Sequence, residues 1–362
     1  MTPENIAIFD KERPAKTYAT YVIGGDIGGT NTNLCVAGIK NTSPNLLFSM
    51  RFKTSQLNSL LPAMKEMLCY AEQQYAISVK HACIGVAGVV SDKQDYARLT
   101  NASWDVNAQE LSDNTSLQHI VIINDFQAAG FGINLLDNIS GDTILVLRKK
   151  QSSYESGHKT KIILGPGTGL GKSILVYNPE AQIYVPIPSE GGHSDFPPYD
   201  EDELSMVQSI KEQIGIKSPL SYEELLSGRG LAHLYSFIRG CGVFPSTEYT
   251  DKIDGSHDKA PLISEYRTKD QTCNEIFRRY ACYFARCAKN FVLDTLATGG
   301  LYIYGGIAVK NREVFQSAGF FAEFERSFRR TEVLQHVPIY LVLNYDIGLK
   351  GACLAAIYYF KL

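Results

Sequence analysis

The chain has 362 residues, of which 44% are hydrophobic and 20% are charged, and its net charge is −3. A single hydrophobic core stops growing at roughly 250 to 300 residues, so a chain of this length predicts two domains. The slightly acidic balance and the lack of a long Lys and Arg run argue against a nucleic-acid partner, and no apolar stretch has the roughly 18 residues that span a bilayer.

The cysteines and the N-terminal segment both point to a reducing compartment. The eight cysteines contain no Cys-x-x-Cys pair and fall mostly inside apolar segments, which favours reduced, buried thiols over a metal site or a disulfide framework. The first sixteen residues carry acidic side chains where a signal peptide needs basic ones. We therefore expect a cytoplasmic protein.

The first part of the chain predicts an α/β domain. Residues 20–53 contain three short β-type runs separated by turn residues, which is typical of an antiparallel meander. The stretch 56–75 repeats apolar residues at helical spacing, and two further β-type runs begin at His81 and His119. A meander followed by strands alternating with helices predicts a mixed sheet.

The remainder predicts a second, larger α/β domain and a helix that returns to the first. The expected elements are strands near 142–148, 161–165 and 172–177, a solvated charged loop over 149–161, helices over 201–214, 221–240 and 270–297, a polar loop over 241–260, strands in LYIYGG and PIYLVL, and a final apolar helix over 348–360. The predicted division is a small domain of residues 1–135 plus 345–362 and a large domain of residues 136–344.

A glycine-rich turn in the first meander is a candidate phosphate site. It reads Gly24-Gly25-Asp26-Ile27-Gly28-Gly29-Thr30-Asn31 and separates two strands. Glycines let backbone amides approach an anion, and Thr30 and Asn31 add side-chain donors. Asp26 fits a divalent cation that bridges it to a nucleotide. A tight hairpin turn without a ligand is the alternative interpretation.

A second glycine-rich turn, Gly165-Pro166-Gly167-Thr168-Gly169-Leu170-Gly171-Lys172-Ser173, superficially suggests a P-loop. The spacing excludes that motif, because Pro166 stands where it needs glycine and a strand pattern follows where it needs a helix. The segment instead predicts a second strand-turn-strand unit that can wrap phosphates with its amides and the Thr168 hydroxyl.

Eight landmarks in order make the chain similar to the bacterial-type glucokinases of the hexokinase, actin and heat-shock-chaperone ATPase superfamily. They run from about residue 21 to residue 357: GDIGGTN, LTNASW, IINDF, GPGTGLG, EGGHSDF, SYEELLSGRGL, YGGI, and a tail from SAGFFAEF to DIGLKGA. The resemblance implies a two-domain actin-like ATPase (ribonuclease H-like) fold with sugar and ATP in the interdomain cleft. It also implies ATP-dependent phosphorylation of D-glucose to glucose 6-phosphate, with Mg2+ as cofactor, and a homodimer.

The resemblance assigns Asp125 as the general base on the sugar 6-hydroxyl. Asn124 and Asp125 end the run HIVIIND, so the carboxylate is expected at the carboxyl end of a strand, where α/β folds hold ligands. The alternative role of Asp125 is the N-cap of the following helix, and the two roles are compatible.

The resemblance also implies the sugar ligands, which are Asn101, Asn124, Asp125, Glu190, His193 and Glu223. Carboxylates suit neighbouring hydroxyls because each accepts two hydrogen bonds. Glu190 and His193 also have a spacing seen at zinc sites, but no helix pattern surrounds them and the cysteine-rich zinc motif of the related repressor-and-kinase family is missing. Gly88 is expected beside the sugar, and Trp104 is expected to pack rather than to stack on a ligand.

The nucleotide-binding residues implied by the resemblance are Asp26, Gly28, Gly29, Thr30, Asn31, Gly167, Thr168, Gly169, Ser227, Gly228, Gly230, Gly305 and Gly306. Asp26 would bind Mg2+ through water. Arg229 departs from the family pattern, in which proline is common at this place, and leaves the contact with adenine or phosphate open.

Two other functions compete with the kinase. A non-catalytic sugar-sensing protein of the same fold would keep the sugar ligands, but only about twenty residues precede the first glycine turn, too few for a helix-turn-helix module. A chaperone-like ATPase would not need Glu190, His193 and Glu223. Within the kinase class, mannose, fructose or an amino sugar stay open as substrates beside glucose.

Overall fold

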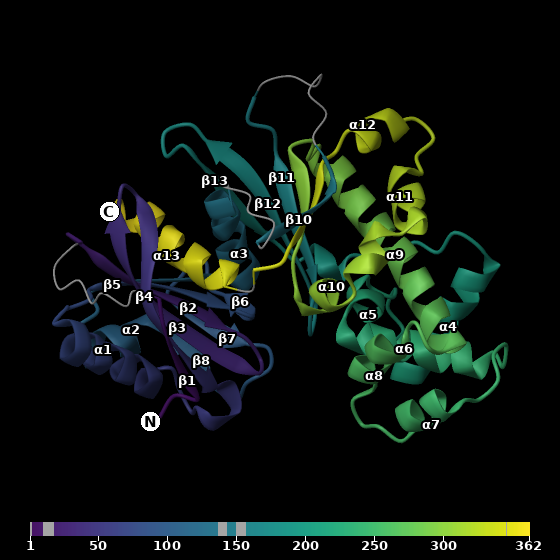
Figure 1. Cartoon of the computed structure of the whole chain (residues 1–362), viewed down its shortest axis with the longest axis horizontal. Coiled ribbons are helices and arrows are strands. Elements are labelled where there is room, and N and C mark those ends of the chain that lie inside the picture. The colour runs from purple at the N-terminus through teal and green to yellow at the C-terminus, as the bar shows by residue number, and fades with distance from the viewer. Residues whose placement is uncertain (1, 10–17, 137–142, 150–156, 345) are drawn as a thin grey trace. The chain divides into compact units, whose positions relative to one another are not determined.

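The computed structural model describes residues 2–9, 18–136, 143–149, 157–344 and 346–362, drawn as a ribbon in Figure 1. By its internal contacts the chain divides into two compact units. Unit 1 comprises residues 1–139, 175–188 and 344–362, and unit 2 comprises residues 140–174 and 189–343. Residues 175–188, which the predicted division placed in the larger domain, belong to unit 1. Most of the predicted loop 149–161 lies outside the described residues.

Unit 1 is built around a six-stranded sheet with the spatial order β1-β4-β3-β2-β5-β9. Its strands are β1 (Asn5–Ile8), β2 (Tyr21–Ile27), β3 (Asn31–Lys40), β4 (Ser43–Lys53), β5 (His81–Val86) and β9 (His119–Asn124). Strands β2, β3 and β4 form the predicted antiparallel meander. Strand β1 is an exposed edge strand that pairs with β4, and the sequence did not predict it.

The other elements of unit 1 are helices and a small three-stranded sheet. They are the short helices η1 (Thr54–Gln56) and η2 (Asn134–Leu136), the α-helices α1 (Leu61–Tyr75), α2 (Ala108–Asn114), α3 (Asp125–Ile133) and α13 (Ile347–Phe360), and the strands β6 (Gly88–Val90), β7 (Tyr96–Leu99) and β8 (Asp105–Asn107). Helix α1 begins later than the predicted residue 56 because Pro62 stands in its first turn, where proline is favoured.

Three neighbouring strands of the sheet bring their carboxyl ends to one edge. Strand β5 runs parallel to β2 on one side and to β9 on the other. The register places Ile27 opposite Val86, and Val86 opposite Asn124. Residues that follow these three strands therefore emerge side by side, as the carboxyl edge of a parallel sheet requires.

Each face of the sheet has its own core, because successive side chains of a strand point to opposite faces. On one face Ile23 and its neighbours pack with α1 and α2, and on the other face Val22 packs with residues of α3 and α13. Cys35 and Cys353 meet in this second core, with their sulfur atoms 3.4 Å apart. The cysteines are free thiols, and Cys69 and Cys241 are exposed where we expected burial.

Helices α3 and α13 approach each other so closely that only glycine fits at their contact. A Cβ atom on Gly351 would lie 1.8 Å from the carbonyl oxygen of Ala128, and one on Gly132 would lie 2.3 Å from the carbonyl oxygen of Ile347. The prediction that the last helix returns to the first domain is thus confirmed, since α13 belongs to unit 1.

We predict that Gly351→Ala lowers the free energy of unfolding by about 2 to 3 kcal/mol, because the new methyl group forces α13 away from α3. Urea unfolding of the full chain measures the change. Gly319→Ala is the matched control, since no atom lies within 4 Å of the added Cβ and alanine favours the helix. Equal losses in the two variants would contradict this account.

Unit 2 combines a second sheet with a cluster of helices. Its strands are β10 (Ile144–Arg148), β11 (Lys161–Pro166), β14 (Gly300–Ile303) and β15 (Ile339–Val342), together with the start of β12 (Leu170–Asn178), which continues into unit 1. Strand β13 (Ile183–Ser189) is the last in the spatial order β10-β15-β14-β11-β12-β13. Strand β14 runs parallel to β11 and β15, and β10 is antiparallel to β15.

The helices of unit 2 are η3 (Gly191–His193), α4 (Glu201–Ile214), α5 (Glu223–Leu226), α6 (Gly228–Gly240), α7 (Glu248–Asp254), α8 (Lys259–Tyr266), α9 (Gln271–Thr295), α10 (Gly306–Lys310), η4 (Arg312–Gln316), α11 (Ala318–Glu325) and α12 (Thr331–Gln335). Helices α4 and α9 are confirmed nearly to the residue. The predicted helix 221–240 is broken at Ser227, and the predicted polar loop 241–260 was wrong, since it contains α7 and the start of α8. None of the described helices is both long and apolar enough to cross a membrane.

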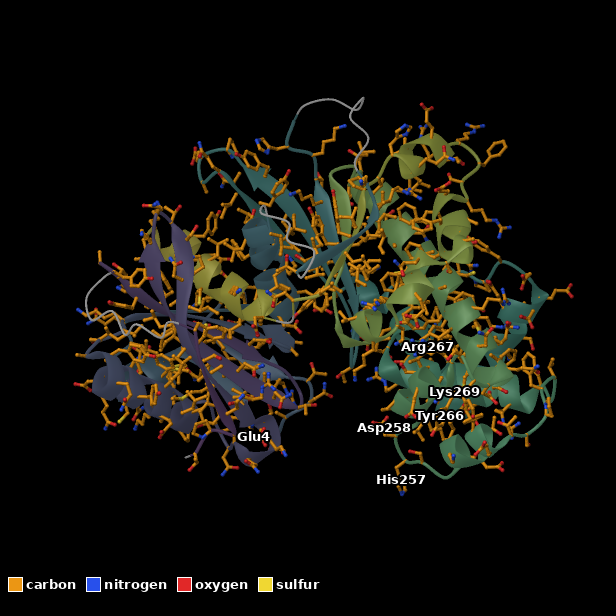
Figure 2. All side chains as sticks on the ribbon, in the orientation of Figure 1. Glu4, His257, Asp258, Tyr266, Arg267 and Lys269 are labelled. Carbon is orange, nitrogen blue, oxygen red and sulfur yellow. The ribbon has the colours of Figure 1, made fainter. Side chains whose placement is uncertain are left out.

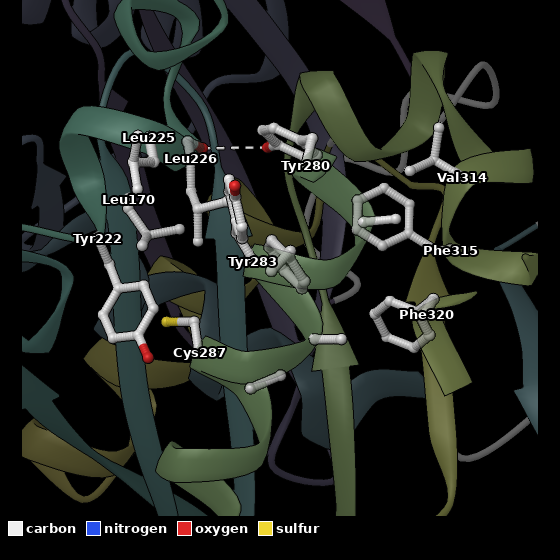
Figure 3. Close-up of a cluster of buried hydrophobic side chains, with 14 of the residues drawn as sticks. Leu170, Tyr222, Leu225, Leu226, Tyr280, Tyr283, Cys287, Val314, Phe315 and Phe320 are labelled. Atoms are coloured by element: carbon white, nitrogen blue, oxygen red, sulfur yellow. Dashed lines mark hydrogen bonds between the residues drawn. The ribbon is translucent and has the colours of Figure 1, made fainter. Parts of the chain in front are cut away.

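The core of unit 2 is rich in aromatic side chains and holds α5 in place. Figure 3 shows Leu225 and Leu226 of α5 among Leu170, Tyr280 and Tyr283, and the Tyr280 hydroxyl donates a hydrogen bond to the Leu226 carbonyl oxygen at 3.0 Å. At the other end of this short helix, the Tyr222 N–H donates to the Ser194 carbonyl oxygen at 3.0 Å, and the Asn290 amide donates to the Tyr222 side-chain hydroxyl at 3.0 Å. The backbone is therefore held at both ends of α5.

A buried ion-pair network ties α9 to α4 and α11. The guanidinium of Arg286 donates to both carboxylate oxygens of Glu203, at 2.6 and 2.8 Å, and to Glu323 at 3.2 Å. The Arg286 side chain is 2% exposed and also covers the ring of Tyr199. A charge buried this completely depends on its partners.

We predict that Arg286→Met lowers the free energy of unfolding by about 3 to 5 kcal/mol, because the Glu203 carboxylate loses its guanidinium partner, while Glu323 keeps Lys289 and Arg326. Arg278→Met in the same helix is the control, since Arg278 is 62% exposed and pairs only with Glu275. That variant should lose less than about 1 kcal/mol. Chemical denaturation at neutral pH compares the two, and similar losses would refute the structural role of the buried network.

Candidate functional site

The turn between β2 and β3 is held in a fixed shape by Thr54, the first residue of η1 after β4. The Gly28 N–H donates to the Asn31 carbonyl oxygen at 2.9 Å, and the Thr54 hydroxyl donates to the Gly28 carbonyl oxygen at 2.8 Å. The Thr54 N–H donates to the carbonyl oxygen of Thr30 at 3.0 Å. The predicted phosphate turn is thus a strand-turn-strand unit with a braced backbone.

Asn101 lies directly against this turn. A Cβ on Gly29 would be 2.8 Å from the Cβ of Asn101, so the structure brings a predicted sugar ligand to a predicted nucleotide-binding glycine. Trp104 is buried and its indole N–H donates to the Thr54 carbonyl oxygen at 3.2 Å, which confirms its packing role. Strand packing explains the glycine at position 88, because a Cβ on Gly88 would lie 2.1 Å from the Arg98 carbonyl oxygen of the paired strand.

The surroundings of Asp26 disfavour the ionised form of its carboxylate. Burial raises its pKa to about 6, the hydrogen bond with Asn33 opposes the rise, and the nearby carboxylate of Asp346 adds to it. A divalent cation would offset this unfavourable charge, and Mg2+ is usually held by one or two carboxylates together with substrate phosphates. Asp26 and Asp346 therefore fit a magnesium ion brought by a nucleotide.

We predict that Asp26→Asn gains stability relative to the wild type as the pH rises. The folded pKa of about 6 exceeds the ordinary value of 3.8, so the stability that protonated Asp26 contributes is complete below pH 3.8 and is lost as the pH rises through about 6. Without Mg2+, the difference in free energy of unfolding between variant and wild type should grow by about 2 to 3 kcal/mol between pH 4 and pH 7.5. A constant difference across that range would contradict it.

Asp125 begins helix α3 at the carboxyl edge of β9. The N-cap is Asn124, whose side chain accepts a hydrogen bond from the Phe126 N–H at 2.8 Å and forms a capping box with Gln127. Our expectation of Asp125 as the N-cap was therefore wrong by one residue. One carboxylate oxygen of Asp125 lies 3.0 Å from the same Phe126 N–H, so the positive end of α3 favours its ionised form. Strand register places it next to β5 and, beyond it, the strand of Asp26.

In unit 2, the turn between β11 and β12 contacts the start of α6. The Gly167 N–H donates to the Gly169 carbonyl oxygen at 2.8 Å, and the Gly228 N–H donates to the Gly167 carbonyl oxygen at 3.0 Å. Gly305 has φ +133°, and a Cβ there would lie 2.5 Å from the Pro166 carbonyl oxygen. Three of the predicted nucleotide segments thus meet around one turn.

A cavity of about 750 Å³ opens beside this turn within unit 2. Among its lining residues are Gly167, Thr168, Gly228 and Gly306 of the predicted nucleotide site. Ser227 and Gly230, which were also predicted to bind the nucleotide, have structural roles. Ser227 is fully buried and caps α6 by accepting from the Gly230 N–H at 3.2 Å, and a Cβ on Gly230 would meet the backbone of Leu225.

Sequence reasoning missed one wall of this cavity, formed by the loop before α8 and by the start of that helix. Figure 2 shows His257 and Asp258 on the loop, and Lys259 and Pro261 of α8 also line the cavity. The polar composition of this segment hid two short helices. The signal that could have found α7 is the Thr247-x-x-Thr250 capping pattern.

Glu223 connects the sugar and phosphate residues of unit 2. One of its carboxylate oxygens accepts a hydrogen bond from the Leu170 N–H at 2.9 Å, next to the glycine turn. The same oxygen lies 2.5 Å from where a Cβ on Gly169 would be, which explains the glycine. The carbonyl oxygen of Leu170 faces Gly192 of the Glu190–His193 segment, where a Cβ would lie only 2.0 Å away.

Glu190 and His193 project from this segment into solvent. Their side chains are 80% and 62% exposed, and the nearest carboxylate oxygen and imidazole nitrogen are 3.9 Å apart. His193 lines a second cavity of unit 2, of about 580 Å³, together with Asp195, Ser221, Glu224, Arg229 and His233. Of the predicted sugar ligands of unit 2, Glu190 and His193 are therefore exposed, with His193 lining this second cavity, and Glu223 is held by the N–H of Leu170.

Comparison with known proteins adds the family to this geometry. The family model described as Glucokinase matches residues 23–358, which is most of the chain. The chain belongs to the glucokinase family. Among its curated relatives, the glucokinase of Nostoc punctiforme is 30% identical over 355 residues, which cover 93% of this chain and 99% of that protein.

Solved structures support the same fold. The glucokinase from Balamuthia mandrillaris in complex with glucose has a TM-score of 0.78 at 20% identity and covers 95% of this chain and 96% of that chain. A ROK family glucokinase from Streptomyces griseus in complex with glucose and AMPPNP has a TM-score of 0.59 at 21% identity, covering 92% and 98%. At these identities the likeness establishes the fold, and the predicted two-domain actin-like kinase fold is confirmed. An enzyme of the glucokinase family transfers a phosphoryl group from ATP to glucose, and the chain is such an enzyme.

Proposed function

We propose that the chain phosphorylates the 6-hydroxyl of D-glucose with MgATP and that Asp125 is the general base. The observation that carries this proposal lies within unit 1. Asp125 emerges at the carboxyl edge of β9, in register with β5 and β2, and β2 leads directly through Asp26 into the braced turn of Gly28–Thr30. A base and a phosphate-binding turn on one sheet edge suit an in-line transfer between them.

In this mechanism Asp125 accepts the proton of the 6-hydroxyl as that oxygen attacks the γ-phosphorus of ATP. The Asn124 cap and the first turn of α3 keep the carboxylate ionised and oriented. Asn101, packed against Gly29, can hold a sugar hydroxyl at a fixed position relative to the turn. Mg2+, when held near Asp26 and Asp346, supplies positive charge to the phosphate oxygens.

Unit 2, taken by itself, carries further predicted sugar ligands and a candidate nucleotide site. Glu190, His193 and Glu223 offer acceptors to sugar hydroxyls, and the carboxylate of Glu223 is held by hydrogen bonds from the Leu170 N–H and from Arg229. The 750 Å³ cavity beside Gly167, Thr168, Gly228 and Gly306 has the size and the glycine-lined wall that a nucleotide needs. The structurally similar ROK family glucokinase from Streptomyces griseus, solved in complex with glucose and AMPPNP, supports this assignment of ligands.

Location and assembly stay predictions of the sequence. We propose a cytoplasmic enzyme, on the grounds of free cysteines and a substrate pair found in the cytoplasm. A homodimer follows only from the family resemblance, and sedimentation of the purified chain tests it.

We predict that Asp125→Asn lowers kcat by about 10² to 10⁴ with little change in glucose affinity, because the amide keeps the position of the carboxylate without its basicity. A coupled assay of ADP release with MgATP measures this across glucose, mannose, fructose and glucosamine. Asp113→Asn, at an exposed acid of α2, is the control and should keep wild-type turnover.

Undiminished turnover in Asp125→Asn would overturn the role of Asp125. Wild-type turnover with another hexose but not with glucose would transfer the proposal to that sugar. Glucose binding by calorimetry without turnover on any sugar would favour the sugar-sensing protein instead.

A further inference from the structure

Arg229 occupies an electrostatically unfavourable place that needs an explanation. It is the second residue of helix α6, directly after the Ser227 cap and Gly228. The first turn of a helix carries partial positive charge, and α6 has no acidic residue there to compensate a cation. The guanidinium must therefore gain its compensation from groups outside its own helix.

That compensation comes from α5. The Nη2 atom of Arg229 donates to Glu223 at 2.9 Å and to Glu224 at 3.3 Å. The side chain of Glu223 is 13% exposed, whereas that of Arg229 is 51% exposed. Arg229 thus reaches from the surface to a carboxylate that is largely covered, where a charged hydrogen bond is screened less than at the surface.

Glu223 is held from two sides as a result. One of its oxygens accepts from the Leu170 N–H of the glycine turn, and the other accepts from Arg229. The backbone on either side of Glu223 is already held by the Tyr280 hydroxyl at Leu226 and by the Ser194 carbonyl oxygen at Tyr222, so these two hydrogen bonds decide how the Glu223 carboxylate points. Each remaining lone pair is then directed toward a defined position.

Arg229 also lies between the two cavities of unit 2. It lines the 750 Å³ cavity with Gly167 and Thr168, and it lines the 580 Å³ cavity with His193 and Asp195. His233, one turn further along α6, lines both cavities as well. The Arg229–Glu223 pair is therefore the link between the candidate nucleotide wall and the candidate sugar ligands.

We propose that Arg229 is a positioning residue that sets sugar affinity by orienting Glu223, and that it does not bind the nucleotide itself. This inference rests on the proposed function, because it takes Glu223 as a sugar ligand. Without Arg229 the carboxylate keeps only the Leu170 hydrogen bond and gains rotational freedom. Loss of one charge-assisted hydrogen bond in a binding group corresponds to roughly a tenfold weaker sugar complex.

The test is isothermal calorimetry of glucose with the full chain, without nucleotide, on wild type, Arg229→Gln and Arg229→Lys. Arg229→Gln should raise the glucose Kd about tenfold, and Arg229→Lys should recover part of the loss because it restores the charge without the planar guanidinium group. Arg278→Gln is the matched control, since Arg278 is 62% exposed, pairs with Glu275 and lines neither cavity, and its glucose Kd should stay within about twofold of wild type.

Steady-state kinetics separate positioning from nucleotide contact. The KM for glucose should rise in Arg229→Gln while the KM for ATP stays within about twofold, a split that general loss of structure does not produce. An unchanged glucose Kd, or a rise confined to the KM for ATP, would overturn the inference. A wild-type chain that neither binds nor phosphorylates glucose would instead overturn the proposed function, and this failure is visible before any variant is made. Arg229→Lys keeps the test valid if Arg229→Gln does not fold.

Discussion

The contact of helices α3 and α13 is the constraint on which the candidate catalytic edge of unit 1 depends. Gly132 and Gly351 remove the side chains that would keep the helices apart, so backbone packs on backbone. Helix α3 starts with Asp125, and the position of its first turn follows from this contact as well as from the register of β9. Helix α13 thus helps to fix the position of Asp125, the proposed base, through its contact with α3.

In unit 2, glycines likewise allow close contacts beside candidate ligand-binding residues. Gly169 lets the Glu223 carboxylate approach the N–H of Leu170, the first residue of β12. Gly192 lets the Glu190–His193 segment approach the carbonyl oxygen of the same residue. The peptide groups of Leu170 therefore connect Glu223 to that segment. Candidate sugar ligands from two segments are thus positioned by one short stretch of main chain. The aromatic core beneath α5 makes that stretch rigid, and rigid support is what a preorganised site requires.

Much of this architecture was readable from the sequence, because glycine turns, strand ends and apolar periodicity are local signals. Both strand-turn-strand units and helices α4, α9 and α13 were predicted. Asn124 and Asp125 are both good caps, and only the pairing of Asn124 with Val86 decides which one ends the strand. Helix α7 escaped because it is short and buries little. The Ser227 cap of α6 is a local pattern that our sequence prediction did not use, whereas the role of Gly230 depends on its close approach to Leu225 of α5.

The order of segments along the chain has a consequence for biosynthesis. A ribosome releases β1 to α3 first, then nearly all of unit 2, and only afterwards α13. Until that helix emerges, the sheet face that carries Val22 and Cys35, together with Phe131 of α3, lacks the cover of α13 and exposes apolar surface. Unit 2 receives its last strand, β15, just before α13, so both cores close only when these two elements emerge. Because the first sheet is made before unit 2, its uncovered face is the apolar surface that is exposed for the longest time during translation.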